Sequence, residues 1–256
     1  MTKAICLHEY GDAENMKWED VNVDVPGELE VRIKHTAVGL NYIDVYQRTG
    51  LYNIGALPTT LGMEAAGIIE EAGKEVKGFS VGDRVAYAMS LGSYSEARIM
   101  TTDRLVKLPE DIDDQTAAAM MLQGMTAQYL LKSSYTVTAG DVVLIMAAAG
   151  GVGQIISQWA KHLGASVIGC VGSLEKAEAA KAAGCDHTIL YGSEDVATRV
   201  HDITNGEGVP VSYDSIGQAT LQASLDSLAP TGTLVSYGNA SGPITNFNPG
   251  TLAAKG

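Results

Sequence analysis

Basic residues are scarce in this chain of 256 residues, which has 17 Lys and Arg against 30 Asp and Glu and a net charge of −13. Binding to a phosphate backbone requires a basic surface, so this balance disfavours nucleic acid and anionic lipid as partners. Apolar runs long enough to cross a bilayer are missing, and the first residues lack a signal-peptide layout. We therefore expect a soluble, cytoplasmic protein that contacts neither a membrane nor nucleic acid.

Cysteine is also rare: Cys6, Cys170 and Cys185 are the three in the chain, far apart in the sequence. An odd number without CxxC spacing gives neither a disulfide framework nor a thiolate metal site. We expect three reduced thiols.

The rest of the composition is that of a globular protein, with 46 % hydrophobic residues. The pattern of apolar and polar residues differs between two parts of the chain. Up to residue 121, short alternating runs such as "LEVRIKHTAVGLN", "EAAGIIEEAGKEV" and "YSEARIM" predict a mostly antiparallel sheet. Gly82 and Asp83 in "FSVGDRV" are a hairpin signal. The sequence thus predicts a first domain, mostly β, over residues 1–121.

From residue 122 onward, apolar strands ("DVVLIM", "SVIGCV", "HTILY", "VPVSYDSIG", "GTLVSYG") alternate with helical periods. This alternation predicts right-handed crossovers and a buried, doubly wound parallel sheet. Gly164, Gly184 and Gly206 stand where C-terminal helix caps belong. The fold class is therefore α/β, with a second domain over 122–256 in which residues 240–256 lack a clear element.

A glycine-rich turn in "GDVVLIMAAAGGVGQIISQWAK" (140–161) joins the first of these strands to a helix. Its A-x-x-G-x-x-G spacing, Ala147, Gly150 and Gly153, is a relative of G-x-G-x-x-G with alanine in place of the first glycine. Gly150 and Gly151 let the main chain approach a pyrophosphate, and Gly153 lets the helix pack closely. A tight turn without a ligand is the alternative, but the strand before and the helix after favour dinucleotide binding.

The tip of the second strand predicts which dinucleotide binds. An NAD site usually carries an acidic residue there, whereas this chain reads "VGSLEK", with Gly172, Ser173 and Lys176. Ser173 can donate to a ribose 2′-phosphate and Lys176 can pair with it. Glu175 could instead face the ribose, and Lys176 could be a solvated helix charge. The balance favours NADPH.

The glycine-rich run, together with "GLNYIDVYQRTGLY", "LGMEAAGIIEEAG", "GDRVAY", "AAAMMLQGMTAQYLL" and "YDSIG", resembles the quinone oxidoreductase/zeta-crystallin group of the medium-chain dehydrogenase/reductase superfamily. The resemblance covers nearly the whole chain. It implies a GroES-like catalytic domain, a Rossmann domain with NADPH in the cleft between them, and NADPH-dependent reduction of quinones.

The same resemblance implies that no metal is bound. Zinc-dependent members of the superfamily have a cysteine where this chain has Asn41 and a histidine where it has Met63. Neither side chain suits Zn²⁺, and Glu64 alone is not a site. The chain therefore resembles the zinc-free branch.

Site residues follow from the resemblance position by position. It implies that Asn41 and Tyr46 lie near the nicotinamide and that Tyr52 is a tyrosine of the quinone pocket. We hypothesise that Asn41 and Tyr52 orient the quinone, whereas the sequence does not decide whether Tyr52, Tyr46 or water supplies the proton. Tyr46 and Tyr52 could instead simply pack, and Asp44 could cap a helix that starts after it. The resemblance implies cofactor contacts at Tyr42, Asp44, Thr126, Tyr129, Gly150, Gly151, Val152, Gly172, Ser173, Lys176, Tyr191, Ile216, Tyr237, Gly238, Asn239 and Ala240.

Members of the group continue beyond "NPGTLAAKG" with an edge strand and a segment that completes the catalytic domain. We therefore expect this sequence to be part of a longer protein; otherwise the strand at 233–238 has an unpaired edge and a family-type homodimer is in doubt. Two other functions stay open: an enone or enoyl reductase of the same superfamily, and a catalytically silent NADPH-binding structural protein, as in lens crystallins.

Overall fold

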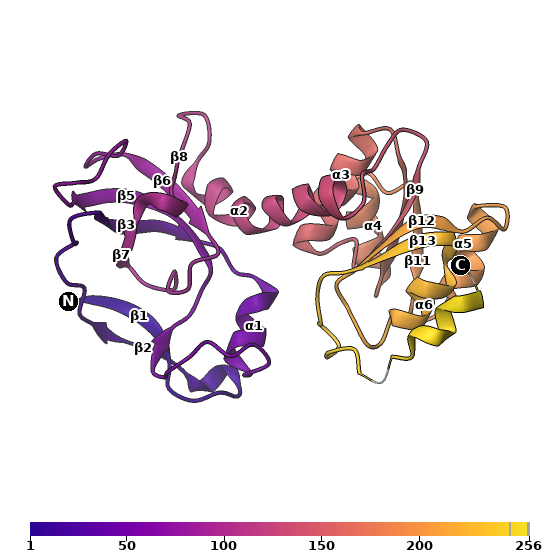
Figure 1. Ribbon diagram of the computed structural model, residues 1–256, viewed down its shortest axis with the longest axis horizontal. Coiled ribbons are helices and arrows are strands. Elements are labelled where there is room, and N and C mark those ends of the chain that lie inside the picture. Colours follow the sequence, from indigo (N-terminus) through magenta and orange to yellow (C-terminus); the bar gives the residue numbers. More distant parts are fainter. Residues whose placement is uncertain (246, 255–256) are drawn as a thin grey trace. The chain divides into compact units, whose positions relative to one another are not determined.

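The computed structural model of the chain describes residues 1–245 and 247–254. It consists of two compact units, unit 1 with residues Met1–Leu122 and unit 2 with residues 123–256 (Figure 1). Throughout the described residues, the helices are too short or too polar to cross a membrane.

Unit 1 is built from antiparallel strands, as the alternating runs predict. One sheet has the order β2-β1-β4 and the other the order β7-β3-β5-β6-β8. The strands are β1 (Thr2–Leu7), β2 (Met16–Val21), β3 (Glu30–Val38), β4 (Thr59–Thr60), β5 (Glu64–Ala72), β6 (Arg84–Ala88), β7 (Ala97–Thr101) and β8 (Val106–Lys107). The helical elements are η1 (Ala13–Asn15), α1 (Tyr42–Arg48), η2 (Thr102–Arg104) and the start of α2 (Asp114–Tyr129).

The hairpin between β5 and β6 is present, but its connection is longer than the glycine signal indicates. Residues 73–83 join the two strands, and the stretch before Gly82 is not a strand. Gly82 has a φ of +92°, and Asp83 donates its N–H to the Ser80 carbonyl, so these residues form a turn. The signal thus marks the turn that leads into β6 rather than a tight two-residue loop.

Unit 2 contains the predicted parallel sheet, with the strand order β11-β10-β9-β12-β13. This order places β9 at the centre of the sheet. The chain adds β10 and β11 on one side of β9 and then β12 and β13 on the other side, as in a doubly wound Rossmann fold. The strands are β9 (Val142–Met146), β10 (Ser166–Val171), β11 (His187–Leu190), β12 (Val209–Asp214) and β13 (Leu228–Ser236). The helical elements are the end of α2, η3 (Leu130–Ser134), α3 (Gly151–His162), α4 (Leu174–Ala182), α5 (Val196–Ile203), α6 (Leu221–Asp226) and η4 (Pro249–Ala254).

Three helices of unit 2 are followed by the glycines that were expected to terminate them. Gly164, Gly184 and Gly206 have φ values of +87°, +99° and +87°, so each adopts the left-handed conformation predicted for a helix terminator. Residues 240–256 were expected to lack a clear element, but the described part of this segment contains the short η4.

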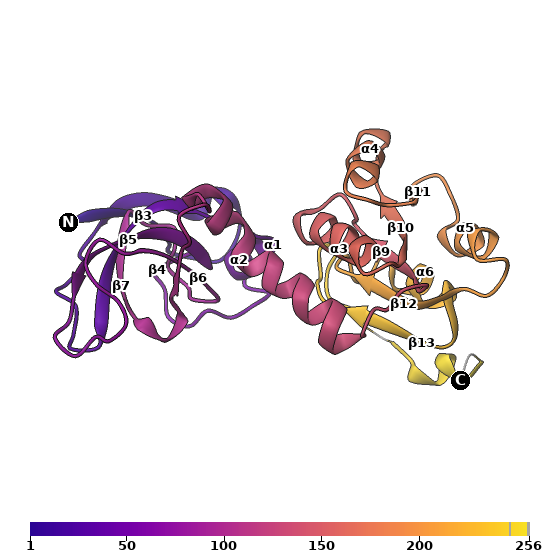
Figure 2. The ribbon, with the colours of Figure 1, turned by 90° about the horizontal axis from the view of Figure 1, so that it is seen from above.

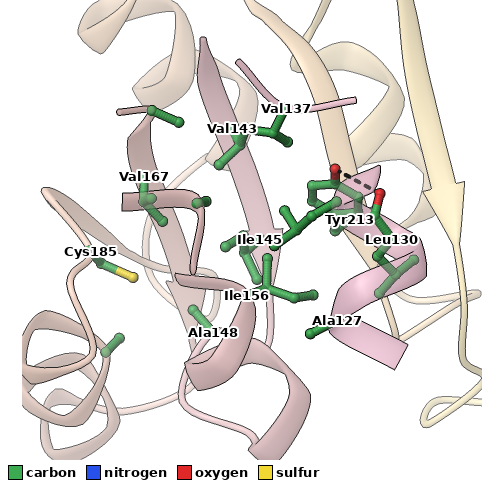
Figure 3. Close-up of a cluster of buried hydrophobic side chains, with 14 of the residues drawn as sticks. Ala127, Leu130, Val137, Val143, Ile145, Ala148, Ile156, Val167, Cys185 and Tyr213 are labelled. Atoms are coloured by element: carbon green, nitrogen blue, oxygen red, sulfur yellow. Dashed lines mark hydrogen bonds between the residues drawn. The ribbon is translucent and has the colours of Figure 1, made fainter. Parts of the chain in front are cut away.

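Helices cover both faces of this sheet (Figure 2). Alternate residues of β9 point to opposite faces, so Val143 and Ile145 join one buried cluster while Leu144 and Met146 join the other. The first cluster contains residues of α2, α3 and α4, and the second contains residues of α5 and α6. Figure 3 shows the first, in which the Tyr213 hydroxyl donates to the Leu130 carbonyl at 3.1 Å. This packing fixes the strand ends at which the candidate site lies.

Candidate active site

The glycine-rich turn lies between β9 and the N-terminus of α3, as predicted. Gly150 is the residue before the helix, in extended conformation, and α3 begins at Gly151. A Cβ on Gly150 would meet only the Ala147 carbonyl oxygen, 3.2 Å away. The first N–H groups of α3 have no intrahelical acceptor, and the helix dipole is positive there. These residues fit a pyrophosphate, because main-chain donors are accessible beside a position without a side chain.

Two other positions of the turn require small residues for packing. A Cβ on Gly153 would lie 2.8 Å from Ala148 Cα, which confirms that this glycine allows α3 to pack against the strand exit. A Cβ on Gly151 would lie 2.6 Å from the side-chain amide carbon of Gln123. Gln123, on α2, was not identified from the sequence, although it falls within the quoted "AAAMMLQGMTAQYLL". It brings the end of α2 against the glycine-rich turn.

Ala147, which replaces the first glycine of the fingerprint, has a φ of +56°. This is the left-handed region that glycine adopts freely and alanine adopts at a cost of about 1–2 kcal/mol. The backbone geometry of the fingerprint is therefore kept without the glycine.

The tips of β10 and β11 bring together Gly172, Ser173, Lys176 and Tyr191. A Cβ on Gly172 would lie 2.6 Å from the Tyr191 hydroxyl oxygen. Ser173 caps α4 by accepting from the Lys176 N–H at 3.3 Å. Ser173 and Lys176 are both exposed, so the hydroxyl and the ammonium can be reached by a ligand. Hydroxyl, phenol and ammonium groups are donors that can hold a phosphate monoester, and Ser173, Tyr191 and Lys176 carry them near this tip.

The tips of β12 and β13 form two loops that are bonded to each other. Asp214 Oδ1 accepts from the N–H groups of Ile216 and Gly217, at 2.8 and 3.0 Å, and its backbone carbonyl accepts from Tyr237 N–H at 2.8 Å. The Ala240 N–H donates to the Ser215 carbonyl. The predicted residues Ile216 and Tyr237–Ala240 therefore lie side by side at the carboxyl edge of the sheet, held by a buried aspartate that sequence reasoning did not single out. The sequence could have pointed to Asp214, since it is the acidic residue of "YDSIG", one of the stretches that carry the family resemblance.

Thr126 and Tyr129 lie on the last turn of α2, three residues apart, so they share one helix face with Gln123. The Tyr129 side chain is partly exposed, and the burial of the rest of it raises the pKa of its phenol. Because Gln123 lies against Gly151, this face of α2 is close to the N-terminus of α3.

In unit 1, Asn41 and Asp44 form a reciprocal capping box at the start of α1. The Asn41 side chain accepts from the Asp44 N–H, and Asp44 Oδ2 accepts from the Asn41 N–H at 2.8 Å. The helix therefore begins at Tyr42, so the alternative of a helix starting after Asp44 is wrong in position although Asp44 does serve as a cap. Tyr94 donates its hydroxyl to the same Oδ2 at 2.6 Å. Burial raises the pKa of Asp44 despite these bonds.

Asn41 and Met63 each form a hydrogen bond with a neighbouring buried side chain. Asn41 Nδ2 donates to Glu64 Oε1 at 2.6 Å, and the Leu122 N–H donates to Glu64 Oε2 at 2.6 Å. Gln47 Nε2 donates to Met63 Sδ at 3.2 Å. Burial raises the pKa of the Glu64 carboxyl. Among the residues that the structure describes, His, Cys, Asp and Glu form no cluster of three able to hold a metal ion.

Three tyrosines of unit 1 form one aromatic group. The Tyr46 ring centroid lies 5.3 Å from that of Tyr42 and 5.1 Å from that of Tyr52. Tyr46 is buried, whereas Tyr42 and Tyr52 are exposed. Ring packing and an exposed phenol are thus both present, since an amphipathic tyrosine can bury its ring and keep its hydroxyl near the surface.

Two family profiles match the chain: "Alcohol dehydrogenase GroES-like domain" over residues 27–139 and "Zinc-binding dehydrogenase" over residues 151–256. The pair of domains and the glycine-rich turn define the class as a medium-chain dehydrogenase/reductase. A quinone oxidoreductase of Pseudomonas aeruginosa is 50 % identical over 257 residues, covering 100 % of this chain and 79 % of that protein. The chain belongs to the quinone oxidoreductase family of this superfamily.

Two further relatives indicate the range of the family. A 2-haloacrylate reductase of a Burkholderia species is 48 % identical, covering 94 % of this chain and 74 % of that protein. The crystal structure of Escherichia coli quinone oxidoreductase complexed with NADPH has a TM-score of 0.97 and 43 % identity, covering 99 % of this chain and 78 % of that one.

Proposed function

We propose that this chain is an NADPH-dependent quinone reductase. The observation that carries the proposal is the glycine-rich turn between β9 and α3, with main-chain donors at the start of α3 and the Ser173–Lys176 tip on the adjacent strand. Family membership supports it, because a quinone oxidoreductase 43 % identical to this chain is known in complex with NADPH.

Unit 2 holds the cofactor in this proposal. Gly151 and Val152 offer main-chain N–H groups to the pyrophosphate, as their place at the N-terminus of α3 supports. Gly150, whose own N–H donates to the Ala147 carbonyl at 2.9 Å, leaves room for the pyrophosphate to approach. Gly172, Ser173, Lys176 and Tyr191 hold the 2′-phosphate end, which their grouping at one tip supports. The remaining proposed cofactor contacts are Tyr42, Asp44, Thr126, Tyr129, Ile216, Tyr237, Gly238, Asn239 and Ala240.

Unit 1 orients the acceptor. NADPH supplies a hydride when bound, and the chain's own residues hold the substrate so that the transfer is effectively unimolecular. Asn41 and Tyr52 orient the quinone, and Tyr52 or Tyr46, or water, provides the proton at the quinone oxygen. Tyr52 has the exposed phenol that such a role needs, while Tyr46 packs against its ring. A quinone is electrophilic without a Lewis acid, so this chemistry requires none of the ligands that Asn41 and Met63 replace.

We further propose that the protein acts in the cytoplasm, does not bind nucleic acid, and forms a family-type homodimer. The net charge of −13 supports the second point. The third rests on the resemblance to the family alone, and pairing through the β13 edge is in doubt if that edge is unpaired in the full protein. Light scattering of the purified protein measures its molecular mass and so distinguishes a monomer from a dimer.

A second candidate function is reduction of an activated carbon–carbon double bond. The 2-haloacrylate reductase at 48 % identity and the CurK enoyl reductase structure at 32 % identity favour it. The third possibility is a silent NADPH-binding protein.

One experiment separates the three functions. The oxidation of NADPH is followed against a panel of quinones, enones and 2-haloacrylates and is repeated with NADH. Turnover that is fastest with quinones and NADPH supports the proposal. Turnover confined to enones or haloacrylates would replace it with the second candidate, and tight NADPH binding without any turnover would replace it with the third. Under the proposal, Tyr52→Phe and Asn41→Ala each lower kcat/KM for quinones.

A further inference from the structure

Glu64 is a fully buried carboxylate at the start of β5, and it touches the candidate substrate-orienting residue directly. Its exposed fraction is 0 %, and its two oxygens accept from two different places in the chain, from Asn41 at the cap of α1 and from Leu122 on α2. We propose that Glu64 is a positioning residue that fixes the orientation of the Asn41 amide for quinone reduction. The inference rests on the proposed function, in which Asn41 contacts the substrate.

The Asn41 amide has two chemically different ends, and both are specified. Nδ2 can only donate, and it does so to Glu64 Oε1 at 2.6 Å. The side-chain oxygen can only accept, and it accepts from the Asp44 N–H in the capping box. A rotation of the amide by half a turn would place two acceptors together at Glu64 and two donors together at Asp44. Glu64 therefore selects one of two orientations that have almost the same shape.

Glu64 is itself held in place, so it can serve as a fixed reference. The Leu122 N–H donates to Oε2 at 2.6 Å, and the Glu64 backbone carbonyl accepts from the Gly39 N–H at 3.1 Å. A Cβ at Gly39 would collide with the Glu64 side chain and with the Ala118 carbonyl oxygen. The glycine thus leaves the room that the carboxylate occupies. A buried carboxylate with two bonded oxygens and no free space has a single position available to it.

The test is a double-mutant cycle between Glu64→Gln and Asn41→Ala. Glutamine keeps the shape of the side chain but replaces one acceptor oxygen with an NH₂ donor, so it cannot accept from both Asn41 and Leu122. We expect kcat/KM for the best quinone to fall about tenfold or more when Glu64→Gln is made in the protein that retains Asn41, because misplacing a reacting group has effects of that order. In the Asn41→Ala background the same change should alter kcat/KM less than about twofold, since Glu64 acts through Asn41.

Additive effects on kcat/KM would overturn the proposal, because Glu64 would then act by a route other than Asn41. So would an unchanged kcat/KM in Glu64→Gln with a lowered melting temperature. Ile69→Val, at another buried position of β5, is the matched control: it lowers stability modestly and should leave kcat/KM unchanged.

The experiment remains decisive if one variant fails to fold, and it separates failure of the proposed function from failure of the Glu64 role. If Glu64→Gln does not fold, Glu64→Asp replaces it in the cycle, since the shorter carboxylate retains the charge but withdraws from Asn41. Wild-type protein that reduces no quinone would refute the proposed function, whereas active wild-type protein with an additive cycle refutes only the role of Glu64.

Discussion

The hydroxyl oxygen of Tyr191 stands 2.6 Å from the point that a Cβ on Gly172 would occupy. The Tyr191 N–H also donates to the Val171 carbonyl at 3.2 Å, so the chain beyond β11 is fixed against the end of β10. Any residue larger than glycine at position 172 would therefore displace the phenol. Ser173 follows Gly172 directly and Lys176 lies on the first turn of α4, so this tip carries residues that can bind a phosphate.

Lys176→Ala should weaken NADPH binding by about tenfold to a hundredfold and leave NADH binding almost unchanged. The reason is that one charge-assisted bond to a phosphate is worth about 1.5–3 kcal/mol, and NADH has no 2′-phosphate. Calorimetric titration of both cofactors measures the difference. Lys181→Ala is the matched control, because Lys181 lies on the same helix but pairs with Glu178 at 2.8 Å. Equal losses for the two cofactors would refute the assignment of Lys176.

Ala147→Gly should stabilise the protein by about 0.5–1 kcal/mol. The φ of +56° at Ala147 strains an alanine, and glycine relieves the strain, although glycine also increases the entropy of the unfolded chain. Urea denaturation gives the free energy of unfolding. Ala148→Gly is the control, because Ala148 is fully buried and outside the positive-φ region, and it should lose stability. A destabilised Ala147→Gly would show that the alanine methyl group outweighs the strain.

Asp214→Ala should lower the free energy of unfolding by at least about 3 kcal/mol. Asp214 is 2 % exposed, and in addition to the two loop N–H groups it accepts from the hydroxyls of Thr220 and Ser224, each at 2.7 Å. Truncation leaves buried donors without an acceptor, which is costly. Asp214→Asn should lose much less, since its oxygen can accept from the loop and its NH₂ can donate to the hydroxyl oxygens. Denaturant curves compare the two, and equal losses would contradict this account.

His35 should make the protein less stable as the pH falls from 6.5 towards 4. The Ser95 carbonyl, 2.6 Å away, can only accept, so His35 Nδ1 carries the proton and Nε2 accepts from the Tyr87 hydroxyl at 2.9 Å. Burial lowers the pKa of His35 from 6.5 to about 4. Between these values the unfolded chain binds a proton that the folded chain does not, so up to about 3 kcal/mol of stability present above pH 6.5 is lost.

The measurement for His35 is the free energy of unfolding against pH for wild type and His35→Gln. The pKa values of Asp44 and Glu64 are raised by burial, so these groups take up protons in the folded state first and act in the opposite direction. Their contribution is common to both proteins and cancels in the difference. A difference that does not change between pH 6.5 and 4 would show that His35 is not the responsible group.

The parallel sheet of unit 2 could be predicted from the sequence because its signals are local. Each apolar strand, each helical period and each terminating glycine, such as Gly164 and Gly184, lies within a short window. The position of α3 after Gly150 is equally local. The strands β1, β2 and β4 were not singled out from the sequence, and the pairing of β1 with β4 joins segments far apart in the chain, for example Cys6 with Thr60.

The candidate site was predictable only in part, for the same physical reason. Residue types reveal glycines and charges at a strand tip, but they do not reveal which buried group holds them. Nothing in the local sequence links Glu64 to Leu122, which lie on different elements and meet only in the folded unit. Asp214 likewise acquires its role from four donors spread over the residues that follow it.

The three cysteines have a practical consequence. All are free and buried, Cys6 in unit 1 and Cys170 and Cys185 in unit 2, and burial raises the pKa of each thiol. A thiolate forms, and an alkylating reagent reaches it, only when the surrounding structure opens. The chain therefore carries a native chemical label in each half, and the alkylation rate at Cys6 against that at Cys170 would report whether the two halves unfold together or one before the other.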